Sequence, residues 1–108
     1  MIIEYLEKIG DSYRDICRYV SQNKIKINKP LIEIFSDINF LLKDTYKLFY
    51  DFNLIDMERF LIRKDNIEKK IFNLAKSPNK NDALLLIHLN IIMNNIFYLN
   101  GPLMINAL

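Results

Sequence analysis

Tyr5-Leu6-Glu7-Lys8-Ile9-Gly10-Asp11 is the run that decides the fold, because its apolar residues have the spacing of a helix. The same run also carries two like charges, Glu7 and Asp11, four residues apart. Around it, apolar residues recur in alternating steps of four and three, the spacing of a bundle seam. They are Ile2, Leu6, Ile9, Tyr13, Ile16 and Val20. On a helix, Glu7 and Asp11 lie about one turn apart on one face, and they repel unless a cation, a basic partner or water screens them. The sequence therefore predicts a helix from about Ile2 to Ser21.

The next stretch predicts a second helix with the same apolar rhythm. The polar, lysine-rich segment 22–29 reads as a connection. Pro30 is well placed in the first turn of the helix that follows, where its missing N–H is no loss. The inward positions recur in the same steps as far as the end of this helix, near Asp51. They are Leu31, Ile34, Ile38, Leu41, Thr45, Leu48 and Phe52.

Two more helices are predicted downstream. Asn53 can cap a third helix, and Asp56 follows three residues later, near the positive helix end. This helix ends near Ser77-Pro78, and a fourth helix starts near Ala83. Asn100-Gly101-Pro102 should break the fourth helix, since proline removes one ladder hydrogen bond and clashes with the preceding turn.

The arrangement of these helices follows from the short connections between them. Successive amphipathic helices joined in this way run in opposite directions. The composition agrees, because the 108 residues include only 2 Gly and 3 Pro while 51% are hydrophobic. We therefore expect an all-α protein, an antiparallel up-down bundle of three to four helices in a single domain over residues 1–108.

The charge balance and the cysteine content narrow the class of protein. The net charge of +2 is too mild to indicate nucleic-acid binding, and no block of lysine and arginine stands out. Cys17 is the only cysteine and falls on the apolar side of the first helix, so we expect a buried thiol, no intramolecular disulfide and a cytoplasmic setting. Glu4, Glu7 and Asp11 interrupt the apolar core that a signal peptide needs.

The predicted fourth helix carries apolar residues around almost its whole circumference between Leu84 and Leu99. Polar residues interrupt it before it reaches the ~20 mainly apolar residues of a membrane span, so we expect no transmembrane segment. The interrupting residues are His88, Asn90, Asn94 and Asn95. Two interpretations of the surplus apolar surface stay open: the helix is central within the monomer, or a second copy covers it in a homodimer.

The first helix resembles a signature of the PhoU family, the helical regulators associated with phosphate uptake. In that family the third helix of each three-helix unit carries a pattern close to Leu-Glu-Arg-Ile-Gly-Asp-His-Ala-x-Asn-Ile. Residues 6–16 here read Leu-Glu-Lys-Ile-Gly-Asp-Ser-Tyr-Arg-Asp-Ile, which departs from the pattern chiefly at Ser12, Tyr13 and Asp15. The rest of the chain looks like one full unit whose own signature has decayed around Asn100. The resemblance implies a shortened PhoU-like protein, the last helix of one unit plus one full unit, which homodimerisation could complete.

The resemblance also implies a metal site, since members of the family can bind iron or zinc through the Glu-x-x-x-Asp pair. Glu7 and Asp11 match that pair. Carboxylates on adjacent turns can chelate or bridge a cation, and further oxygens could come from Asp37 and Asp44 on the second helix. The alternative is a solvated helix face on which Arg14 pairs with Asp11 and contributes little to stability.

The residues favour a protein that is not an enzyme. His88 and Cys17 are the only histidine and cysteine, so no Ser-His-Asp or Cys-His constellation can be assembled with any specificity. The two glycines are too few for a glycine-rich phosphate loop. The resemblance implies a non-enzymatic regulator or adaptor of phosphate uptake or signalling that binds a transporter ATPase or a sensor kinase. An iron- or zinc-binding helical module and a homodimerisation scaffold stay open as alternatives.

Overall fold

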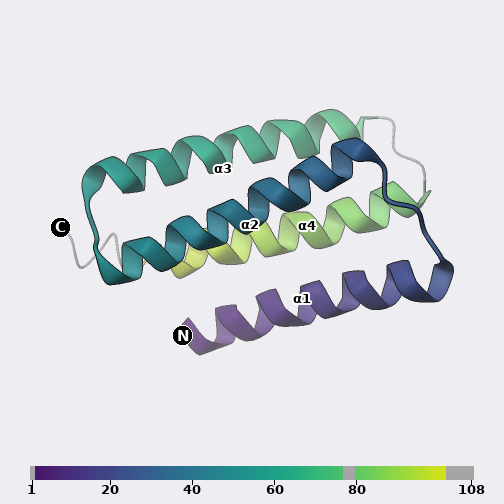
Figure 1. Cartoon of the computed structure of the whole chain (residues 1–108), viewed down its shortest axis with the longest axis horizontal. Helices are drawn as coiled ribbons and strands as arrows, with labels where there is room; N and C mark the ends of the chain where they lie inside the picture. The colour runs from purple at the N-terminus through teal and green to yellow at the C-terminus, as the bar shows by residue number, and fades with distance from the viewer. Residues whose placement is uncertain (1, 77–79, 102–108) are drawn as a thin grey trace.

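The computed structural model describes residues 2–76 and 80–101, which form four long α-helices lying side by side (Figure 1). α1 spans Ile2–Asn23, α2 spans Lys29–Tyr50, α3 spans Leu54–Ala75 and α4 spans Lys80–Leu99. No strand occurs within the two described ranges, so the prediction of an all-α helical bundle is confirmed. The helix bounds lie within a single turn of the predicted ones.

Asparagine side chains begin two of the helices. Asn53 Oδ1 accepts a hydrogen bond from the backbone N–H of Asp56 at 2.8 Å, so the predicted cap of α3 is confirmed. Asn28 caps α2 in the same way, accepting from the N–H of Leu31 at 3.1 Å, and Pro30 occupies the first turn as predicted. Both caps satisfy backbone donors that have no partner inside the helix.

α4 is the central helix of the bundle. It packs closely against α1, α2 and α3, and in Figure 1 it lies along α2 in the middle of the molecule. Its fully buried side chains include Leu85, Leu89, Ile92, Met93 and Ile96. Burial on several sides explains why apolar residues occupy so much of its circumference, since a helix with three neighbours needs more than one apolar stripe. The structure therefore supports the interpretation in which the fourth helix is central within the monomer.

Ion pairs tie α2 to α3 along their length. Asp44 approaches Arg63 at 2.8 Å between Oδ2 and Nε, and Asp37 approaches Lys70 at 2.6 Å between Oδ2 and Nζ. Asp37 comes before Asp44 in α2, whereas its partner Lys70 comes after Arg63 in α3. The two helices therefore run in opposite directions.

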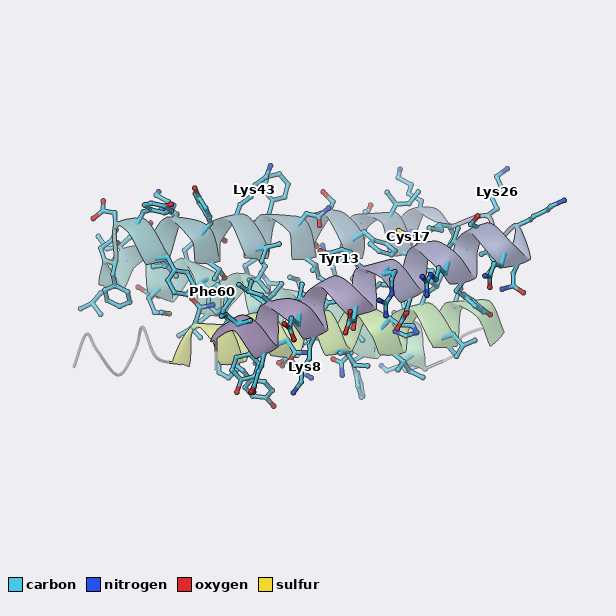
Figure 2. The ribbon with its side chains drawn as sticks, turned by 90° about the horizontal axis from the view of Figure 1, so that it is seen from below. Lys8, Tyr13, Cys17, Lys26, Lys43 and Phe60 are labelled. Atoms are coloured by element: carbon cyan, nitrogen blue, oxygen red, sulfur yellow. The ribbon has the colours of Figure 1, made fainter. Side chains whose placement is uncertain are left out.

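α1 corrects two expectations about buried side chains. Leu6 was expected in the bundle seam and Cys17 was expected to be buried, yet both are exposed. The reason is that α1 packs closely on α4, whereas no comparably close backbone packing joins it to α2. Figure 2 shows Tyr13 and Cys17 on the side of α1 that faces α2, with Lys8 on the other side. Side chains on the α2 side lack a closely packed neighbour to bury them.

One helix in the described part of the chain is long and apolar enough to cross a membrane by length and composition alone. It covers Asp82–Leu99, within α4. The core helix of a soluble protein passes the same test, and 44% of this window is buried inside the bundle.

Candidate functional site

The acidic pair of the predicted metal site lies on the outer face of α1. Glu7 and Asp11 are both exposed. Asp11 Oδ1 lies 3.4 Å from Nη1 of Arg14, one turn further on, and Arg14 also reaches Asp15 at 3.6 Å. Arg14 therefore screens the repulsion between the two carboxylates, and an ion pair this exposed adds little to stability.

The proposed second half of the metal site is wrong. Asp37 and Asp44 were expected to supply oxygens toward α1, but they pair with Lys70 and Arg63 on α3. Their positions on α2 point them to the opposite neighbour. Within the described residues, no group of three or more histidine, cysteine or carboxylate side chains is close enough to hold a metal ion. Iron or zinc binding by Glu7 and Asp11 stays a prediction.

A buried polar cluster joins α2 to the end of α4. Asn100 is fully buried, and its Nδ2 donates to Thr45 Oγ1 at 3.0 Å and to the backbone carbonyl of Ile96 at 2.9 Å. The Thr45 hydroxyl in turn donates to the carbonyl of Leu41 at 3.1 Å. Sequence reasoning treated Asn100 as part of a helix break and of a decayed signature, and not as a buried residue. The threonine within the apolar stripe of α2 was the signal that could have indicated a buried polar partner.

Beside this cluster, an apolar hollow of about 530 Å³ opens between the first half of α1 and the second half of α2. We call it the α1–α2 groove. It is lined by Leu6, Leu42, Thr45, Tyr46, Phe49, Tyr50 and Leu99. Figure 2 shows its origin, since α1 is inclined to α2 and diverges from it toward the N-terminus. Sequence reasoning missed the groove because it depends on the inclination of one helix.

Polar and aromatic contacts shape the α1–α2 groove. Tyr13 crosses the gap between the helices, and its hydroxyl donates to Asn39 Oδ1 at 2.8 Å. Partial burial raises the pKa of Tyr13 above its ordinary value, so the hydroxyl keeps the proton that it donates. On the α2 side, the rings of Tyr46 and Tyr50 contact each other at a tilt of 46°, with their centroids 4.7 Å apart. The two tyrosines form an exposed aromatic ridge along one side of the hollow.

A second apolar surface lies between α3 and α4. Phe72 is 67% exposed and Ile87 is 56% exposed, and both line a shallow hollow of about 350 Å³ with Ala75 and Ala83. Ile91 follows Ile87 by one helical turn and is also exposed. We call Phe72, Ile87 and Ile91 the α3–α4 strip. Ile87 and Ile91 belong to the apolar surface of α4 that the other helices leave uncovered, and Phe72 adjoins Ile87 from α3.

Comparisons of the chain with known proteins give no further information on these surfaces. No family model, no curated protein and no solved structure matches the chain. The resemblance to the PhoU signature therefore rests on residues 6–16 and on the helical order of the chain.

Proposed function

We propose that this chain is a non-enzymatic adaptor of the PhoU type, an antiparallel up-down bundle that regulates phosphate uptake or signalling through protein–protein contacts. The signature-like run at residues 6–16 and the four-helix architecture support this proposal. Its expected setting is the cytoplasm, and its expected partners are a transporter ATPase or a sensor kinase.

The observation that carries the proposal is the α3–α4 strip. Phe72 of α3 and Ile87 of α4 line one hollow, and Ile91 lies one helical turn beyond Ile87. Exposed apolar side chains on two neighbouring helices are unfavourable in water, and apolar patches of this kind mark interaction sites. Asn90 lies beside the strip and lines the same hollow. An apolar strip with an amide at its edge suits the face of a partner helix, because the amide can bond a polar group at the rim of the contact.

The experiment measures binding of the purified chain to the ATPase subunit of a phosphate transporter, and in parallel to a phosphate-responsive sensor kinase, by calorimetry. We expect the wild-type chain to bind one of the two proteins. Ile87→Glu should weaken that binding about tenfold or more, because it places a charge at the centre of the contact. Ile62→Glu is the matched control, since Ile62 is an exposed isoleucine on α3 away from the strip.

Two results would contradict the proposal. One is that neither protein binds the wild-type chain at concentrations up to about 100 μM. The other is equal binding of either protein by the Ile87→Glu and Ile62→Glu variants, which would separate the interaction from the strip.

A further inference from the structure

The α1–α2 groove lies where the described part of the chain ends. Leu99, the last residue of α4, lines the groove, and residues 102–108 follow shortly after it in the sequence. We propose that this 102–108 segment folds back into the α1–α2 groove and covers it, so that the chain itself supplies the occupant. This surface is separate from the α3–α4 strip, so the proposal does not depend on the proposed function.

The composition of the 102–108 segment matches that of the groove. The segment reads Pro-Leu-Met-Ile-Asn-Ala-Leu and contains no charged side chain. Its large apolar residues are Leu103, Met104, Ile105 and Leu108. Exposing such a run to water is unfavourable, and so is leaving an apolar hollow of about 530 Å³ open beside it. Docking removes both surfaces from water at once.

The 102–108 segment is also long enough to cover the groove. The α2 side of the groove runs from Leu42 to Tyr50, which is about 12 Å of helix. Seven residues span about 10 Å as a helix and at most about 25 Å when extended. Pro102 cannot donate to the hydrogen-bond ladder of α4 and clashes with the preceding turn, so we expect the chain to leave the axis of α4 here.

Asn100 fixes the point from which the segment starts. Its Nδ2 donates to Oγ1 of Thr45, a residue of the groove wall, so the chain leaves α4 beside the groove. Its Oδ1 is buried and accepts no hydrogen bond within the described residues, whereas buried oxygens nearly always have a donor. The N–H of Leu103 lies three residues on, which is the spacing of an asparagine cap. In the proposed arrangement this N–H donates to Asn100 Oδ1 and holds the start of the segment beside Thr45.

The first test traps the segment in the full chain by disulfide formation. Cys17→Ser removes the only cysteine, which is exposed. In that background, Ile105→Cys is combined either with Tyr46→Cys in the groove or with Tyr98→Cys. Tyr98 is the matched control, since it is an exposed tyrosine close to the end of α4 that does not line the groove.

We expect the disulfide within one chain to form at least about tenfold faster at position 46 than at position 98. Docking raises the local concentration of the two thiols at position 46, whereas a segment that is not held meets both positions. Oxidised glutathione serves as the oxidant, and gel electrophoresis without reductant follows the products over time.

The second test places one added charge at two neighbouring positions of the segment. Ile105 lies two residues from Leu103 and three from Leu108, so it shares a face with an apolar residue in an extended or a helical segment. Ile105→Asp should therefore release the segment, because it puts a charge into an apolar contact. The aromatic NMR signals of Tyr46 should shift, and the melting temperature should fall by about 4 °C or more. Asn106→Asp is the matched control and should change neither.

Three results overturn the inference. One is an equal rate of disulfide formation at positions 46 and 98. Another is a disulfide between two chains as the main product, since the segment then belongs to the groove of a second copy. The third is identical aromatic NMR signals of Tyr46 in the Ile105→Asp and Asn106→Asp variants. None of these measurements uses the transporter ATPase or the sensor kinase, so the proposed function is tested separately.

Discussion

Asn100 donates a hydrogen bond of 3.0 Å to the hydroxyl of Thr45, and this contact fastens the end of α4 to the apolar face of α2 near the C-terminal end of α2. Both side chains are buried, with Thr45 2% exposed and Asn100 fully enclosed. Asn100 Oδ1 has no hydrogen-bond partner within the described residues. A buried polar pair of this kind costs stability when one member is removed, and less when both are replaced.

Thr45→Val should therefore lower the free energy of unfolding by about 1–2 kcal/mol, because it keeps the shape but removes the acceptor of the amide N–H. Combining it with Asn100→Leu should cost less than the sum of the two single changes, since no polar atom of the pair is then left buried. Urea unfolding followed by circular dichroism gives all three values. Strict additivity would show that the two side chains do not interact.

Gly10→Ala should stabilise the chain by about 0.5–1 kcal/mol, because glycine in a helix interior loses more backbone freedom than alanine. A Cβ atom added at Gly10 meets nothing within 4 Å, so no clash offsets this gain. Thermal unfolding at a concentration where the chain is monomeric checks the value. A lower melting temperature would show that the helix backbone is approached closely at this position.

Asn53→Ala should destabilise the chain most near neutral pH. A hydrogen bond from Asn53 is the main cause that holds the pKa of Asp56 below its ordinary value of 3.8, with help from Lys47 and Arg59. A carboxyl with a lowered pKa contributes stability above its unfolded pKa, and this contribution is lost as the pH falls through the folded pKa.

The difference in melting temperature between Asn53→Ala and the wild type should thus shrink as the pH falls below the ordinary carboxyl pKa, toward the effect of the lost backbone cap alone. Asn66→Ala, at an exposed position of α3, serves as the control and should show no such trend. A difference that stays constant over this range would contradict the link to Asp56.

If Glu7 and Asp11 hold iron or zinc, the metal should raise the melting temperature by mass action on the folded state. At a hundredfold excess over the dissociation constant the gain is about 2.7 kcal/mol. Asp11→Asn and Glu7→Gln should each abolish the shift, whereas Asp15→Asn on the same helix should keep it. A shift of the same size in Asp11→Asn would place the metal elsewhere, and no shift in the wild type would favour the solvated helix face.

Local signals in the sequence were enough for the helices themselves. The alternation of apolar steps, the proline in the first turn of α2 and the Asn53 cap act over a few residues, so they can be recognised without knowing the neighbours. The same periodicity identified the seam of α2, where all of Leu31, Ile34, Ile38, Leu41, Thr45 and Leu48 are buried.

The candidate surfaces could not be derived in this way. A helix with a wide apolar stripe has two flanks, and the sequence does not say which flank a neighbour covers. Leu6 and Cys17 were placed inside because they share the apolar side of α1, yet both are exposed, since α1 packs closely on α4 and not on α2. Asp37 and Asp44 were assigned to the wrong neighbour for the same reason.

The sequence by itself thus determined that this chain forms four helices, and it identified most of the side chains that enter the core. Only the tertiary structure decided that α4 lies at the centre, that α1 opens a groove beside α2, and that Phe72, Ile87 and Ile91 stay exposed. The physical reason is that helical periodicity is encoded within a few turns. The direction and inclination of each helix depend instead on packing between segments that are far apart in the chain.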